Sequence, residues 1–126
     1  MKNLIIAICL FCVMLAGIIA VDVTMKKNID DMLELCDELI EEVDNEDWNK
    51  IIPIFDEINS KWLNFRSVLF ILLNHADIDN VDFALIELNS MIEAKELSHV
   101  KNYAENLKFY MDELLDTEEI SLENIL

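Results

Sequence analysis

Few residues in this sequence carry the functional groups of a catalytic or metal site, and the densest group surrounds His75. His75, Asp77 and Asp79 alternate along the chain, and Asp82 follows about one turn later. An imidazole nitrogen and carboxylate oxygens are ligands for divalent cations. The segment lacks the glycine and the distal glutamate of a calcium loop, so a polar turn that caps a helix is the favoured interpretation. We expect no metal site and keep His75, Asp77 and Asp79 as candidate ligands.

Other catalytic arrangements lack partners in the sequence. Gly17 is the only glycine and lies in an apolar run, which excludes a glycine-rich phosphate loop. A cysteine nucleophile needs a nearby base. The two histidines that could act as this base for Cys36 are His75 and His99. The neighbours of Cys36 at helical spacing are apolar, which favours its interpretation as a small buried hydrophobic residue. We therefore expect no catalytic residue, no cofactor and no enzymatic activity.

The charge is strongly negative and unevenly distributed. The chain has 126 residues and a net charge of −17, and residues 28–126 hold 25 of its 26 acidic residues but only six of its nine basic residues. That segment carries −19 and repels phosphate backbones, so we expect no nucleic-acid partner. An anionic lipid surface would repel it as well.

The N-terminal segment has the length and composition of a membrane span. Residues 4–21 contain no charge. At about 1.5 Å per residue this run covers roughly 27 Å, close to a hydrocarbon core of about 30 Å. We predict a stub over residues 1–3, a transmembrane anchor over 4–23 and a juxtamembrane linker over 24–28. A cleaved signal sequence is the alternative; Ile18 at the −3 position of its best cleavage site, which ends at Ala20, disfavours it.

The basic residues on the two sides of the anchor are nearly balanced and do not by themselves decide its orientation. Lys2 and the terminal amine stand on one side, and Lys26 and Lys27 on the other. The short N-terminal stub is typical of a signal anchor. We therefore expect a single-pass protein of the cell membrane whose acidic domain is extracytoplasmic.

Apolar residues recur at helical spacing over residues 29–116, which predicts an acidic four-helix domain. The first helix is capped by Asn28 or Asp30 and ends at an acidic break over residues 44–47. The second helix begins between Asp47 and Asn49, because Pro53 is tolerated near a first turn and costs about 3 kcal/mol in a helix interior. Trp48 and Trp62 lie on its apolar stripe and are interpreted as core aromatics.

The second half repeats this pattern. A turn over residues 74–77 precedes a helix that starts near Asp79, and a turn over 94–96 precedes a helix from Leu97. Residues 68–73 (VLFILL) are apolar on every face, and we expect neighbouring helices or the tail to bury them. Residues 117–126 form a C-terminal tail that either folds back on the core or starts a last helical turn at Ser121.

The two halves align when the chain is displaced by 49 residues. Cys36 then meets Leu85, Val43 meets Ile92 and Trp62 meets Met111. Duplication and the chance alignment of two amphipathic hairpins both explain this repeated pattern of apolar positions. Either origin gives an all-α fold in which the N-terminal transmembrane helix precedes two antiparallel hairpins, arranged as a four-helix bundle or as a TPR-like pair.

Several motifs follow one another in a recognisable order. They are the apolar N-terminus, Glu46-Asp47-Trp48, Trp62, the segment from His75 to Asp79, Leu85 to Leu88, and the ending Leu122-Glu123-Asn124-Ile125-Leu126. In this layout nearly the whole chain resembles a family of short bacterial proteins, found mainly in clostridia, called domain of unknown function 4363. The resemblance implies one membrane span followed by an acidic helical domain, and it transfers no catalytic residues. Members are encoded near multi-span membrane proteins, which implies a membrane partner.

These patterns favour a membrane-anchored, non-catalytic helical interaction module that binds another membrane or envelope protein. The alternative is an acidic domain that binds or senses divalent cations at the membrane surface, which requires carboxylates to converge around His75, Asp77 and Asp79. The expected partners are membrane lipid, through the N-terminal helix, and a membrane protein. The oligomeric state stays open.

Overall fold

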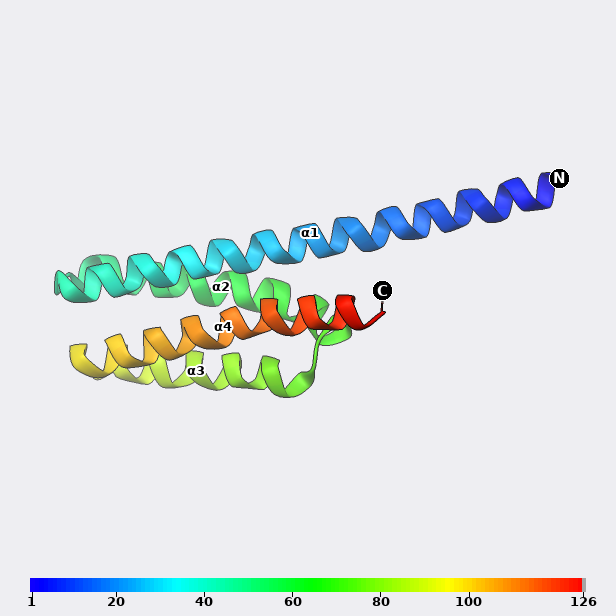
Figure 1. Ribbon diagram of the computed structural model, residues 1–126. Helices are drawn as coiled ribbons and strands as arrows, with labels where there is room; N and C mark the ends of the chain where they lie inside the picture. Colours follow the sequence, from blue (N-terminus) through cyan, green and yellow to red (C-terminus); the bar gives the residue numbers. More distant parts are fainter. Residues whose placement is uncertain (126) are drawn as a thin grey trace.

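The computed structural model describes the backbone of residues 1–125 and the side chains of residues 1–116. Every regular element in the described backbone is an α-helix, which confirms the predicted all-α fold (Figure 1). The four helices are α1 (Lys2–Asp44), α2 (Trp48–Leu72), α3 (His75–Glu93) and α4 (Leu97–Ile125). The expected break before residue 117 is absent, because α4 continues to Ile125. The side chains of the predicted tail, residues 117–126, lie outside the described part.

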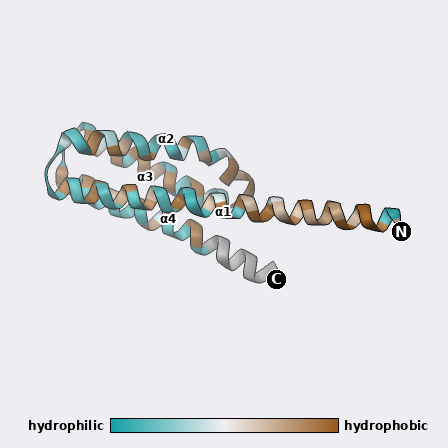
Figure 2. Ribbon diagram, turned by 90° about the horizontal axis from the view of Figure 1, so that it is seen from above, coloured by the Kyte–Doolittle hydropathy of each residue, from teal (hydrophilic) through white to brown (hydrophobic). Residues whose placement is uncertain are grey.

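Helix α1 is one continuous rod that carries both the apolar segment and the first helix of the domain (Figure 2). Residues 24–28 are therefore helical, and the predicted caps at Asn28 or Asp30 are wrong. The polar residues of this segment bond within the helix: Thr24 Oγ1 donates to the Ala20 carbonyl (2.7 Å), and Asn28 Nδ2 donates to the Thr24 carbonyl (2.9 Å). Side chains that bond a carbonyl four residues earlier do not need a break in the helix.

The start of α2 agrees with the prediction, and the start of α3 does not. Asp47 caps α2 by accepting a bond from the Asn49 amide (3.1 Å), and Pro53 lies inside the helix, on an exposed face. Asn74 caps α3 in the same way through the Ala76 amide (3.0 Å), so α3 begins at His75 and not near Asp79. The predicted turn over residues 74–77 is thus the cap and first turn of a helix.

The four helices form an antiparallel bundle. Helix α1 packs against α2 and α4, and α3 packs against the same two helices; the packed pairs in the described part do not include the diagonal pairs α1–α3 and α2–α4. The α1–α2 and α3–α4 connections lie at the same end (Figure 1). This ring of neighbours is a four-helix bundle, whereas a TPR-like pair would pack the first helix of each hairpin together.

The core combines the apolar stripes of all four helices. Burying such stripes stabilises a bundle through the hydrophobic effect. Its buried members are Met25, Ile29, Met32, Leu35, Cys36, Leu39 and Val43 of α1; Ile51, Phe55, Ile58, Trp62 and Leu69 of α2; Ile78, Val81, Ala84, Leu85, Leu88 and Ile92 of α3; and Val100, Ala104, Leu107, Met111 and Leu114 of α4.

The 49-residue repeat extends to the backbone of the two hairpin turns. Glu46 and Lys95 are the two non-glycine residues with positive φ in the described part, at 57° and 59°. The residues before them, Asn45 and Ala94, have φ of −80° and −76° with the same ψ of −7°. The backbone bonds of the turns also match in pairs: Asn45 to Glu41, Glu46 to Val43 and Asp47 to Glu42 in the first, and Ala94 to Ser90, Lys95 to Ile92 and Glu96 to Met91 in the second.

The apolar segment over residues 68–73 is only partly covered, which corrects the expectation that it is buried. Leu69 is fully buried, and Phe70 and Leu73 pack partly on the core. Val68, Ile71 and Leu72 remain 40%, 85% and 48% exposed. We call these three side chains the apolar corner.

A candidate binding groove between α2 and α3

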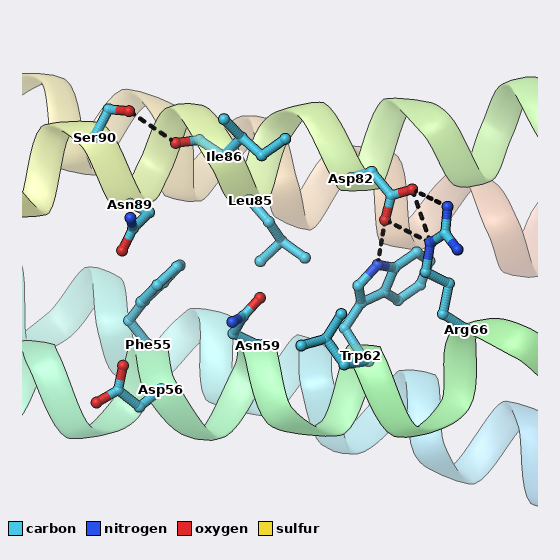
Figure 3. A pocket seen from close by; sticks show the side chains of 11 residues that line it. Phe55, Asp56, Asn59, Trp62, Arg66, Asp82, Leu85, Ile86, Asn89 and Ser90 are labelled. Carbon is cyan, nitrogen blue, oxygen red and sulfur yellow. Dashed lines mark hydrogen bonds and ion pairs between the residues drawn. The ribbon is translucent and has the colours of Figure 1, made fainter.

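A groove of about 540 Å³ runs along the seam between α2 and α3 (Figure 3). Its floor consists of the buried side chains Phe55, Trp62 and Leu85. Its rims carry Leu63 from α2 and Ile86 from α3, which are 61% and 63% exposed. Large apolar side chains on both rims of an apolar floor mark a surface that contact with a partner would stabilise.

The 49-residue repeat relates the seam that contains this groove to another seam between neighbouring helices, and the two seams differ. A displacement of 49 residues relates α1 to α3 and α2 to α4, so the α2–α3 seam corresponds to the α1–α4 seam. Two ion pairs cross the α1–α4 seam: Lys101 Nζ lies 2.7 Å from Asp44 Oδ1, and Lys108 Nζ lies 2.7 Å from Asp37 Oδ1. These carboxylates raise the pKa of both lysines above the ordinary value, chiefly through the hydrogen bonds.

The corresponding positions of the α2–α3 seam cannot form these pairs. Lys108 and Asp37 correspond to Asn59 and Ile86. Lys101 corresponds to Ile52, which leaves Glu93, the counterpart of Asp44, without a lysine opposite it at that position. The α2–α3 seam therefore lacks both of these pairs; the ion pair that does cross it joins Arg66 to Asp82 at one end of the groove.

One end of the groove is closed by a polar cluster (Figure 3). Asp82 Oδ1 accepts a hydrogen bond from Trp62 Nε1 (2.7 Å), and Arg66 binds the same carboxylate through Nε (2.8 and 2.9 Å) and Nη2 (2.6 Å). These bonds to Asp82 raise the pKa of the Arg66 guanidinium. The Arg66 guanidinium also lies 4.5 Å from the centre of the Phe70 ring. This contact ties the groove to the end of α2 that carries the apolar corner.

The opposite half of the groove is lined by amide and hydroxyl side chains and by the carboxylate of Asp56. Ser90 Oγ donates to the Ile86 carbonyl (3.1 Å), and Asn89 Nδ2 donates to Glu93 Oε1 (3.1 Å). Asn59 lines the groove from α2. This half therefore offers amide, hydroxyl and carboxylate groups beside an apolar floor, a combination that orients a bound peptide.

The candidate metal ligands are not brought together. His75, Asp77 and Asp79 lie two residues apart in the first turns of α3, so Asp77 projects from a different side than the other two. The His75 ring packs on Phe70, with ring centres 4.5 Å apart. Among the residues that the structure describes, no group of three or more His, Cys, Asp or Glu side chains has the arrangement of a metal site.

Cys36 lies in the core and faces away from solvent. Burial raises the pKa of its thiol to about 12, with a further increase from Asp37. A thiol with this pKa is neutral at pH 7, so it lacks the thiolate that a cysteine nucleophile requires.

Sequence reasoning did not find the groove. Its residues include ordinary core positions, such as Phe55 and Leu85, and the one that belonged to a candidate motif, Asp82, was considered there for metal binding. A usable signal existed in the 49-residue alignment, where Ile86 replaces Asp37 and Leu63 replaces Asp112. An apolar residue that replaces a charged one at a helix surface marks a face with a different neighbour.

Fold and groove together define a class of protein: a small acidic four-helix bundle whose first helix extends as an apolar rod and which has an open seam between its two hairpins. The family model described as "Domain of unknown function (DUF4363)" matches residues 20–125, and the chain belongs to this family. Comparisons with curated proteins and with solved structures gave no match.

Proposed function

We propose that the protein is a membrane-anchored, non-catalytic interaction module whose α2–α3 groove binds a helix of another membrane or envelope protein. The observation that carries this proposal is the difference between the two related seams. One is bridged by the Lys101–Asp44 and Lys108–Asp37 ion pairs. The other is bridged by Arg66 and Asp82 at one end of the groove and has an apolar floor with exposed apolar rims. The open seam exposes apolar surface that gains stability when a partner covers it.

Charge and length indicate the chemistry of the partner. The segment from residue 28 onward carries −19, so it attracts a basic segment and repels an acidic one. From Phe55 to Arg66 the groove follows α2 for about 16 Å, or three helical turns. The ligand that fits is an amphipathic helix with an apolar stripe at i, i+3 and i+7 and with basic flanks.

The membrane location rests on α1. Its N-terminal part is long and apolar enough to cross a membrane by length and composition, a property that signal sequences share. In the proposal this part is an uncleaved single-pass anchor, because α1 continues without interruption into the core of the bundle. In this proposal the acidic domain is extracytoplasmic.

The alternative, a cation-binding domain, has less support. A smaller hollow of about 220 Å³ between α1 and α2 is lined by Asp31, Glu34, Glu38 and Glu57, but Lys61 lies among them. Within the described residues these carboxylates do not form a metal-binding group. Thermal melting with and without calcium or magnesium separates the two functions, since a bound ion raises Tm by mass action.

The proposal predicts that a photo-crosslinking amino acid at Leu63 traps one membrane protein in intact membranes. The matched control carries the same amino acid at Asp112, the counterpart of Leu63 on the other hairpin, which is also exposed. The trapped protein is identified by mass spectrometry, purified and titrated against the full-length chain. Rising salt weakens the affinity if basic residues of the partner meet the acidic domain.

Two results would overturn the groove as the binding site. One is equal trapping of the same protein from the Leu63 and Asp112 positions. The other is trapping at Leu63 of a protein that shows no affinity for the chain when both are purified.

A further inference from the structure

The apolar corner lies at the end of the bundle where α1 leaves it (Figure 1). Ile71 is 85% exposed and is among the most exposed apolar side chains of the bundle. Residues 67–74 (SVLFILLN) contain no charged side chain. An uncharged patch at this place is compatible with an apolar environment and is unfavourable in water.

The height of the corner along α1 follows from the antiparallel pairing of α1 and α2. Glu46 lies in the middle of the connecting turn, so residues at equal separations from it lie at about the same level. The ion pair between Lys50 and Glu42, four residues on either side, fits this rule with Nζ 3.7 Å from Oε1.

The same rule places Ile71 level with Val21 and Leu72 level with Ala20. Val21 is the last residue of the uncharged run that begins at Leu4, and Asp22 follows it. The corner is therefore level with the boundary at which α1 changes from an apolar to a charged helix (Figure 2). Two separate parts of the chain place apolar side chains at one height.

We infer that Ile71 and Leu72 insert into the lipid beside α1 and form a second membrane contact of the protein. This inference rests on the membrane location proposed above. The occupant is the outer region of an electrically neutral bilayer, because the chain carries −17 and an anionic surface would repel it. Two contacts, the anchor and the corner, would hold the bundle upright and restrict its tilt.

A fluorescent label at the corner tests this contact in the full-length chain. Ile71→Cys receives an environment-sensitive NBD label, and Ser98→Cys, exposed at the opposite end of the bundle, is the matched control. Cys9→Ala and Cys12→Ala remove the two exposed thiols of the anchor. Cys36 stays unlabelled because it is buried and the pKa of its thiol is about 12. Each protein is reconstituted in phosphatidylcholine vesicles with and without doxyl-labelled lipid.

We expect the label at position 71 to emit at shorter wavelength and to lose about half of its intensity or more to doxyl lipid, as a group within the bilayer boundary does. The label at position 98 should be unchanged.

If the protein floats with the vesicles but position 71 behaves like position 98, the corner contact is overturned and the anchor remains. If the label is shielded from water but not quenched by doxyl lipid, a protein surface covers the corner, which also overturns the inference. If the protein does not float with the vesicles, the proposed membrane location fails too.

Discussion

At the scale of single residues, Asp82 connects the two hairpins across the α2–α3 seam. Its carboxylate accepts the indole N–H of Trp62, which is 1% exposed, and binds the Arg66 guanidinium at the same time. A buried indole N–H without an acceptor is costly, so this carboxylate satisfies a group that belongs to the core of α2. Reading Trp62 as a core aromatic was correct, but the sequence did not reveal its partner on α3.

We predict that Asp82→Ala lowers the free energy of unfolding by about 2 kcal/mol, because it leaves the Trp62 N–H and Arg66 unpaired. Asp82→Asn keeps an acceptor but loses the charge, and should cost about half as much. Glu87→Ala, exposed on the same helix, is the control and should stay within about 0.5 kcal/mol. Urea unfolding of the full-length chain in detergent measures all three. Equal effects of Asp82→Ala and Glu87→Ala would contradict the role of Asp82.

At the scale of elements, helical periodicity predicted the apolar faces of all the helices and both hairpin turns. The predicted helix starts were wrong where a polar residue can either cap a helix or lie inside one. Asn28 resembles a cap but bonds the Thr24 carbonyl inside α1, and both Asn74 and Asp79 are suitable caps for α3. The choice between such uses depends on tertiary packing. The groove was beyond prediction for a similar reason, since it depends on which helix surfaces face each other.

The two hairpin turns supply a prediction about the backbone. Glu46 and Lys95 adopt the left-handed conformation, which glycine enters without steric cost. Glu46→Gly should raise the stability by about 0.5–1 kcal/mol. Lys95→Gly should gain less, because Lys95 Nζ lies 4.6 Å from the centre of the Trp48 ring and this contact is lost. The alanine variants of both residues are the controls, and thermal melting is the measurement. A larger gain for Lys95→Gly than for Glu46→Gly would contradict this order.

At the scale of the whole molecule, one hairpin frame is used twice with different outer surfaces. The turns and the buried positions repeat, while the residues at the two seams do not. The α1–α4 seam has lysines opposite aspartates, and the α2–α3 seam has Asn59 opposite Ile86 at one of those positions. The repeated turns and buried positions form the core of the bundle, and the seam that differs supplies the candidate binding surface.

This difference predicts that the groove can be closed by restoring the missing pair. Asn59→Lys with Ile86→Asp copies the Lys108–Asp37 pair onto the α2–α3 seam. We expect a folded bundle with stability within about 1 kcal/mol, as for an exposed ion pair, and loss of crosslinking from Leu63. Asn59→Lys alone is the control and should retain crosslinking. Unchanged crosslinking in the double variant would separate partner binding from the groove.

If α1 is the membrane anchor of the proposed function, its unbroken course fixes the distance from the membrane at which the groove could bind a partner. With the membrane boundary at Val21, a helix without a flexible joint sets the far turn at Glu46 about 37 Å above the bilayer. The rims of the groove at Leu63 and the floor at Phe55 then stand about 12 and 24 Å above it. A tether of this kind works as a spacer of constant length. It would select partners whose basic helix emerges close to the membrane surface and would ignore similar helices carried farther out.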